Sequence, residues 1–129
     1  MDLLTNSSVP YLSKVMDVLS QRHRVIANNI ANVNTPKYRA KDIAFKKIIQ
    51  KFIKAKQGSS NMEEYENQIN KIQAEVFLRN KGNVNSGDND VDLDTEMAGL
   101  SANTLMFKTY AQILKAKLKQ IKIAINDKV

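Results

Sequence analysis

The last third of the chain carries a heptad pattern whose seam residues are nearly all apolar. Between residues 97 and 125 these positions recur at alternating steps of three and four, as on one face of a long helix packed along a seam. Acidic residues within positions 92–96 suit the start of such a helix, where they cap free amide groups. We predict a helix over residues 93–126, on the order of 50 Å long. Its seam positions are Leu100, Phe107, Leu114, Leu118 and Ile121.

A second, shorter seam lies near the N-terminus. Pro10 suits a first helical turn, and the asparagine-rich stretch after residue 27 suits a helix end, which predicts a helix over residues 9–33. Its seam positions are Leu12, Met16, Leu19, Ile26 and Ile30. We predict a mainly α fold in which the two terminal helices pair as an antiparallel coiled coil. Because two helices alone leave apolar surface open, we expect both ends to gain order on assembly.

The middle of the chain, residues 34–92, is the least regular part. Apolar residues between 45 and 53 fit a short basic amphipathic helix, and residues 67–79 fit either a helix or a strand. Extended strands or a small, loose β-hairpin are favoured near residues 75–79 and 90–93. With 129 residues the chain forms about one domain with one modest core. We therefore predict a single domain over residues 1–129.

Few residues suit catalysis or metal binding. The chain has no cysteine and one histidine, His23, which we expect to be packed or interfacial. The acidic run starting at Asp88 fails as a calcium loop, because Leu93 and Gly99 stand where glycine and glutamate belong. We predict no enzyme, no catalytic residue, no metal site and no cofactor.

The formal net charge of +7 raises the question of nucleic-acid binding. The cations follow the outer faces of all the predicted helices, and no zinc-finger, homeodomain or RNA-binding motif accompanies them. A solvated basic surface is the simplest interpretation, and an acidic neighbouring subunit is another. A basic helical nucleic-acid-binding protein and a coiled-coil adaptor remain the alternative functions.

The N-terminus lacks the basic segment and following apolar segment of a secretory signal, so we predict no cleaved signal peptide. No apolar run approaches the roughly 20 residues of a membrane-spanning helix, so we predict no membrane insertion.

Two stretches carry a family resemblance. "ANNIANVNTPKYRAKDIAF", residues 27–45, and "NDVDLDTEMAGLSANTLMFKTYAQILKAKLKQIKIAI", residues 89–125, resemble the two ends of the rod and hook family of bacterial flagellar axial proteins, especially its short proximal rod members. The family usually has glycine after Thr-Pro, where this chain has Lys37. The motif positions are Asn28, Asn29, Asn32, Asn34, Thr35, Pro36 and Tyr38.

The resemblance implies a structural subunit of the proximal rod of the flagellar basal body. Such a subunit polymerises helically through its terminal helices and joins the membrane ring to the drive shaft. The implied partners are other rod subunits, the rod-to-ring junction protein, the membrane ring and the type III export apparatus, with no nucleic acid among them. The implied location is the basal body, reached from the cytoplasm without a cleaved signal peptide.

Overall fold

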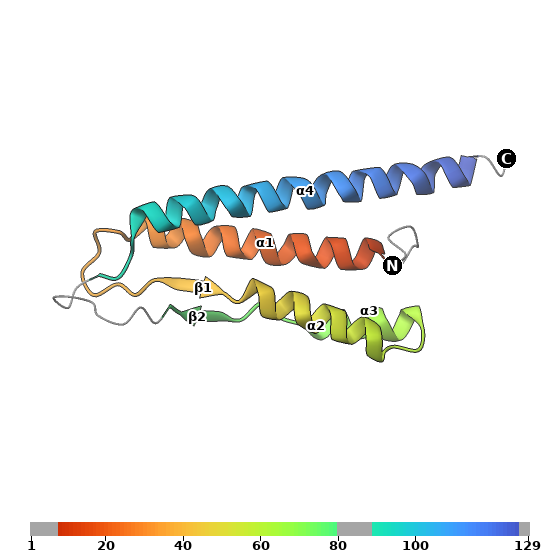
Figure 1. The fold of residues 1–129 in the computed structure, drawn as a ribbon, viewed down its shortest axis with the longest axis horizontal. Helices are drawn as coiled ribbons and strands as arrows, with labels where there is room; N and C mark the ends of the chain where they lie inside the picture. The colour runs from red at the N-terminus through yellow and green to blue at the C-terminus, as the bar shows by residue number, and fades with distance from the viewer. Residues whose placement is uncertain (1–7, 80–88, 127–129) are drawn as a thin grey trace.

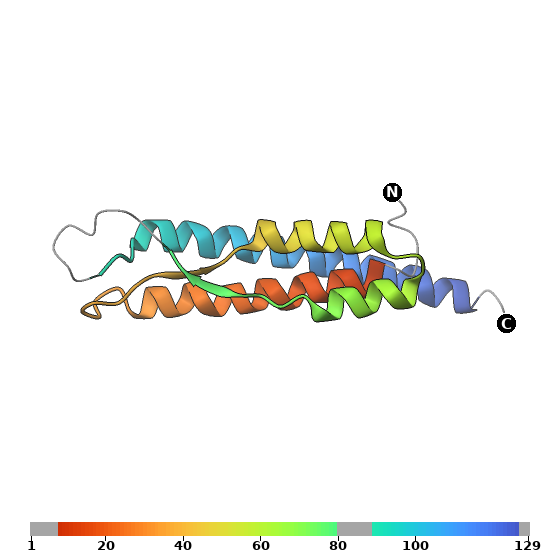
Figure 2. The ribbon, with the colours of Figure 1, turned by 90° about the horizontal axis from the view of Figure 1, so that it is seen from below.

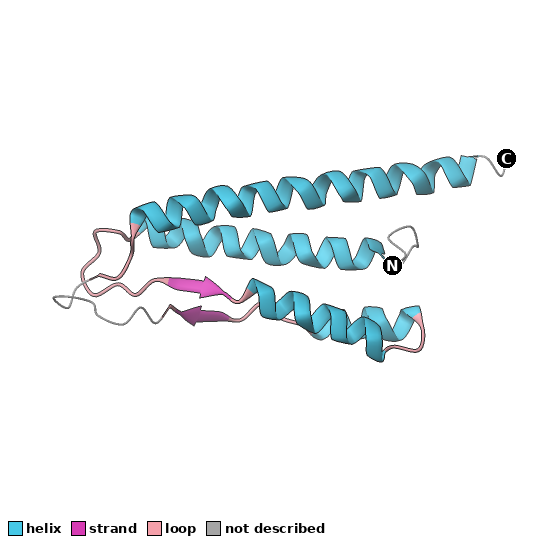
Figure 3. Cartoon of the chain, in the orientation of Figure 1, coloured by secondary structure: helices cyan, strands magenta, loops and turns pink. Residues whose placement is uncertain are grey.

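A computed structural model describes residues 8–79 and 89–126 of the chain. Helices dominate, and two short strands form one antiparallel sheet (Figure 3). The elements in chain order are α1 (Ser8–Ala31), β1 (Lys41–Ile43), α2 (Phe45–Gly58), α3 (Met62–Lys71), β2 (Val76–Leu78) and α4 (Leu93–Asn126).

The elements form an elongated stack in which α1 occupies the middle layer (Figure 1). On one side of α1 lies α4, which runs antiparallel to it and makes the most extensive contact between any two elements. On the other side lie the sheet and the α2–α3 pair, whose two helices run side by side (Figure 2). The predicted antiparallel pairing of the terminal helices is therefore confirmed.

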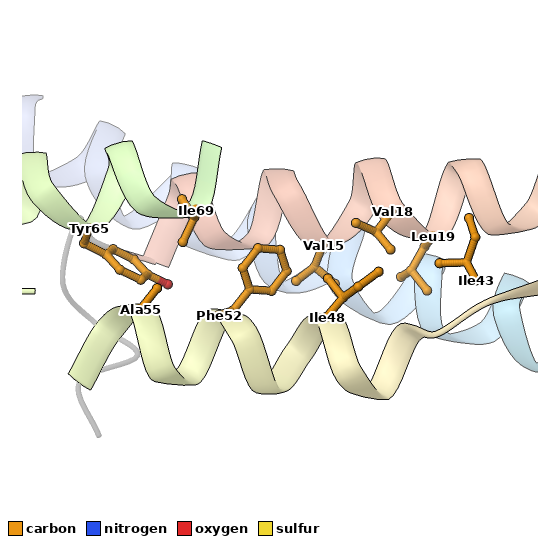
Figure 4. Packing of buried hydrophobic residues seen from close by; sticks show 9 residues of the cluster. All are labelled: Val15, Val18, Leu19, Ile43, Ile48, Phe52, Ala55, Tyr65 and Ile69. Atoms are coloured by element: carbon orange, nitrogen blue, oxygen red, sulfur yellow. The ribbon is translucent and has the colours of Figure 1, made fainter. Parts of the chain in front are cut away.

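The apolar core lies between α1 and the α2–α3 pair. Val15 and Leu19 of α1 are completely buried and face Ile48 and Phe52 of α2 (Figure 4). The ring of Tyr11 meets the ring of Phe52 edge to face, with centroids 5.6 Å apart. α4 contributes no fully buried residue to this core and only packs partly buried side chains against it. The main core cluster consists of Val15, Val18, Leu19, Ile43, Ile48, Phe52, Ala55, Tyr65 and Ile69.

The two terminal helices follow their predicted bounds closely. α4 begins and ends at the predicted residues, and Asp92 caps it by accepting a hydrogen bond from the Thr95 amide at 3.1 Å. α1 ends two residues before the predicted end. The amide of Asn32 is shared between the carbonyls of Asn28 and Asn29, at 3.1 and 3.2 Å, which tightens the last turn into the loop.

The predicted basic helix in the middle is confirmed as α2, although Ile53, expected on its apolar face, is 50% exposed. The middle is more regular than predicted, because residues 62–71 form a further helix, α3. Asn61 is its N-cap, and the Asn61 side chain accepts a hydrogen bond from the Glu64 amide at 2.9 Å.

The strand predicted near residues 75–79 is confirmed as β2, but a hairpin pairing it with residues 90–93 is wrong. β2 pairs instead with β1, with Lys41 opposite Leu78 and Ile43 opposite Val76, so the α2–α3 pair is inserted between the two strands. Asn89 and Asp90 lie alongside the segment before β1, where Asn89 forms a bridge with Tyr38. Turn-forming residues in the local sequence favour a hairpin, but β2 pairs with a strand that is distant in the sequence, and two helices lie between the two strands in the chain.

Candidate functional site

Polar side chains occupy the buried face of α4. Its three buried residues in the described part of the chain are Glu96, Asn103 and Lys117, at 1%, 1% and 5% exposure. They are separated by seven and fourteen positions, so they share one heptad face. The apolar seam predicted for this helix lies next to that face and not on it.

The predicted seam positions therefore divide unequally between the two helices. In α1, Leu12, Leu19 and Ile26 are buried, and Met16 and Ile30 are half-buried. In α4, Phe107 is 36% exposed and Leu118 is 51% exposed. The remaining predicted seam positions of α4 are half-buried: Leu100, Leu114 and Ile121. One helix has its apolar seam covered, and the other keeps much of it open.

Two adjoining grooves run between α1 and α4 on this open side. Phe107 lines both: it faces Met16 in one groove and His23 in the other. His23 is exposed, so the expectation of a packed histidine is wrong, and its position at a groove leaves it at the candidate interface. The grooves are a continuation of the open apolar stripe of α4.

α4 also projects beyond α1. The Asn103 side chain donates to the Leu19 carbonyl at 2.9 Å, which places residue 103 of α4 beside residue 19 of α1. Counting back from Leu19 to Ser8 along α1 and forward by the same number along α4 reaches about residue 114. The remaining part of α4 continues for about 18 Å past the first residue of α1 (Figure 1). Within it, Leu118 and Ile125 are 51% and 62% exposed.

A buried polar cluster, the Asn29 cluster, ties the opposite end of the molecule together. Asn29 is completely buried, and its amide oxygen accepts from the Tyr38 hydroxyl at 3.1 Å and from the Lys41 amide at 3.0 Å. Its amide nitrogen donates to the Lys41 carbonyl at 2.8 Å and to Glu96 Oε2 at 3.1 Å. All four hydrogen-bonding positions of the side chain are thus used.

Charged residues extend this cluster. The other oxygen of Glu96 accepts from Arg79, which also reaches Asp42 Oδ2 at 3.4 Å. Asp42 Oδ1 in turn accepts from Arg22 Nε at 3.1 Å. The Asn29 cluster comprises Asn29, Tyr38, Glu96, Arg79, Asp42 and Arg22. It joins α1, β1, the residue after β2 and the first turn of α4. Burial of the Tyr38 ring, followed by the nearby charge of Glu96, raises the pKa of the Tyr38 hydroxyl.

The Asn-Thr-Pro turn is closed by local hydrogen bonds. Thr35 Oγ1 donates to Asn32 Oδ1 at 3.0 Å, and Asn89 Nδ2 donates to the Asn32 and Thr35 carbonyls at 2.7 and 2.8 Å. Lys37, where the family usually has glycine, has a φ of 61°, in the left-handed region. The turn therefore keeps the conformation that glycine favours, with a lysine in it.

The predicted motif residues thus play different parts. Asn29 and Tyr38 are brought together in the cluster, and Asn32 and Thr35 close the turn. The remaining motif positions, Asn28, Asn34 and Pro36, are exposed. The sequence prediction missed Glu96 as a buried partner of Asn29. The signal was available in the seven-residue spacing of Glu96 and Asn103, which marks polar residues on the inner face of the helix.

Neither a metal-binding cluster nor a membrane-crossing helix occurs in residues 8–79 and 89–126. No group of three or more histidine, aspartate or glutamate side chains there is arranged to hold a metal ion. None of the helices in these ranges is both long and apolar enough to cross a membrane.

Comparison with known proteins gives one consistent family. Residues 16–39, covering most of α1 and the Asn-Thr-Pro turn, match the family described as "Flagella basal body rod protein". The chain is 26% identical to the flagellar basal body rod protein FlgB of Bacillus subtilis, over 95% of this chain and 96% of that protein. It is 27% identical to FlgB of Borreliella burgdorferi, over 92% and 96%, and 26% identical to FlgB of Escherichia coli, over 88% and 89%.

Proposed function

We propose that this chain, a FlgB-like structural subunit of the flagellar basal body rod, assembles into the proximal rod through the open side of its α1–α4 pair. In this proposal the subunit has no enzymatic role and polymerises helically with its neighbours, so that the rod joins the membrane ring to the drive shaft. The family and its relatives support the rod assignment and lend no support to a nucleic-acid-binding or adaptor role.

The observation that carries the proposal is the apolar stripe that α4 keeps exposed. Monomeric proteins rarely leave large apolar side chains in a continuous row, and such rows mark interaction surfaces. Met97, Phe107, Leu118 and Ile125 are each between 36% and 62% exposed and lie within about 80° of one another around α4. Leu105, Ile113 and Ile123 are also exposed, on other sides of the helix. A helix from a neighbouring subunit packed into the α1–α4 grooves covers this stripe and extends the coiled-coil packing.

The stripe and the projecting end of α4 favour a heterologous contact. One subunit offers a projecting helix end, and its neighbour offers the grooves between α1 and α4. A contact between two different surfaces repeats from copy to copy and builds an open helical assembly. The partners in this proposal are other rod subunits, the rod-to-ring junction protein and the membrane ring. In this proposal the subunit reaches them through the type III export apparatus.

The test is a charge placed on the exposed stripe, in Leu118→Asp. Leu118 is half exposed in the free subunit, so the variant keeps its fold, but a carboxylate buried at a subunit contact loses its hydration. We expect the variant, expressed in cells lacking the natural chain, to leave basal bodies without a rod in electron micrographs. Leu114→Asp, at a predicted seam position that lines one groove, should give the same loss.

The matched control is Gln120→Asp, two residues away on the same turn of α4 but on a different side of the helix. It introduces the same charge into the same exposed end of the helix, and we expect it to assemble rods. Rods of normal length in cells producing folded Leu118→Asp protein would mean that the stripe is not an assembly surface.

A further inference from the structure

The exposed side of α2 carries the densest group of like charges on one short helix of the described chain. α2 has five lysines and no acidic residue in 14 positions. Four of these lysines fall within about 140° of the helix circumference, at 100° per residue. We call this surface the basic face of α2, and it consists of Lys46, Lys47, Lys51 and Lys54, all exposed.

The lysines of this face form no ion pair in the described part of the chain. Within residues 8–79 and 89–126, none of its lysines lies within 4.0 Å of a carboxylate, whereas Arg22, Arg39 and Arg79 each have an acidic partner there. Lys47 and Lys51 are four positions apart, and Lys51 and Lys54 are three apart, so like charges are neighbours on the helix surface. Such pairs destabilise the free helix, and an opposite charge supplied from outside relieves that repulsion.

The opposite side of α2 packs into the apolar core. Ile48, Phe52 and Ala55 are buried against α1 and α3, as Figure 4 shows for their side chains pointing inward from α2. A helix that lies in a membrane surface must insert its apolar face among the lipids. α2 has no free apolar face, and Ile53 is the one large apolar side chain exposed among its lysines. The geometry therefore favours a rigid acidic protein surface over a lipid surface.

We propose that the basic face of α2 is a second docking surface, which binds an acidic helix or strand of a neighbouring protein in the basal body. This inference rests on the proposed rod function, because that function places other proteins around the subunit. From Lys47 to Lys54 the face extends about 10 Å along the helix. The partner surface carries a row of carboxylates over that length. α4 lies on the far side of α1 from α2 (Figure 1). The grooves are lined by residues of α1 and α4, so both surfaces can be occupied together.

The first experiment measures binding of the full purified chain to fluorescent poly-L-glutamate by anisotropy. The test variant replaces all four lysines of the basic face: Lys46→Gln, Lys47→Gln, Lys51→Gln and Lys54→Gln. The matched control removes the same charge from scattered positions: Lys14→Gln, Lys37→Gln, Lys41→Gln and Lys71→Gln. We expect the test variant to weaken binding by about tenfold or more and the control by less than about threefold, with both differences shrinking at high salt.

A second variant covers the case in which the fourfold variant fails to fold, as judged by circular dichroism. Lys51→Glu alters only the centre of the face, and we expect it to weaken binding by about threefold or more. Equal losses in the test and control variants would overturn the proposal, because binding would then follow net charge alone. Binding to phosphatidylglycerol vesicles that requires the basic face, without any such requirement for poly-L-glutamate, would also overturn it in favour of a lipid surface.

The second experiment separates this inference from the proposed function. Each variant is expressed in cells lacking the natural chain, and basal bodies are isolated. We expect the unaltered chain and the scattered control to restore rods, and the basic-face variant to fail although it is folded. Normal rods with the basic-face variant would overturn the inference and leave the rod function intact. Failure of the unaltered chain to enter basal bodies would instead contradict the proposed function.

Discussion

Asn29 donates to Glu96 Oε2 at 3.1 Å, and this contact joins the last turns of α1 to the first turn of α4. Both residues are buried, at 0% and 1% exposure, and each has further partners within the subunit. The contact fixes where the two helices begin to run together. The position of the exposed α4 stripe relative to the α1–α4 grooves depends on it.

Replacing Asn29 by alanine should lower the free energy of unfolding by about 3 kcal/mol. The change removes four hydrogen bonds and leaves Glu96 and the Lys41 amide without this partner inside the protein. Urea unfolding followed by circular dichroism measures it. Asn34→Ala, at an exposed asparagine of the same motif, is the control, and its change should stay within about 0.5 kcal/mol. Similar losses at both positions would contradict the special role of Asn29.

Asn103 is as buried as Asn29, yet only half of its amide is used. Its nitrogen donates to the Leu19 carbonyl, while its oxygen has no hydrogen-bond partner in the described structure. Asn103→Leu removes that isolated acceptor with a side chain of similar size and should raise the free energy of unfolding by about 1 kcal/mol. Asn29→Leu should instead lower the free energy of unfolding. The urea midpoints of the two variants, compared with that of the unaltered protein, should therefore shift in opposite directions.

Lys37 adopts a backbone conformation that suits glycine. Because a left-handed conformation costs a residue with a side chain about 1 kcal/mol, Lys37→Gly should stabilise the protein by about 0.5 to 1 kcal/mol. Lys47→Gly, on the exposed surface of α2, is the control for glycine itself and should destabilise by about 1 kcal/mol. Thermal unfolding of the two variants should therefore shift in opposite directions.

Alkaline pH should destabilise the protein through its buried tyrosines. Burial raises the pKa of Tyr11 and of Tyr65 above the ordinary value, so the unfolded chain loses these phenolic protons at lower pH than the folded one. Their contribution to stability is complete below the unfolded pKa of about 10 and is lost as pH rises from there towards the folded values. Urea unfolding between pH 8 and pH 11 should show this loss, to a smaller extent in Tyr65→Phe.

Hydrogen exchange should distinguish the two terminal helices in the free subunit. α1 supplies Val15, Val18 and Leu19 to the core, so its middle should exchange slowly. α4 projects past α1 beyond about residue 114; Lys117 there is buried, but the residues after it are exposed except for the half-buried Ile121. Residues 118–126 should therefore exchange fast and become protected on assembly. This changes the sequence-based expectation that both ends gain order on assembly, because α1 is already packed. Equal protection of both helices in the free subunit would contradict it.

The middle of the chain shows where prediction from sequence stops. The apolar spacing of Ile48 and Phe52 was enough to identify α2, because residues one helical turn apart in the sequence lie on the same face of a helix. The strand that pairs with β2 could not be identified in the same way, because Val76 pairs with Ile43 and the two helices α2 and α3 lie between them in the chain. Pairing over that distance is set by how the helices pack and leaves little trace in the local sequence.

The sequence by itself determined the two long helices, their antiparallel pairing and the resemblance to flagellar rod proteins. Periodicity, capping residues and the Asn-Thr-Pro motif are local features, and each is decided by residues close together in the chain. Only the tertiary structure decided which face of α4 turns inward. The fully bonded Asn29 and the ion pair of Glu96 hold a polar face against α1, because buried polar groups must be paired once they leave water. Because this polar face of α4 is turned towards α1, Phe107 and Leu118 remain exposed, where a neighbouring subunit can contact them.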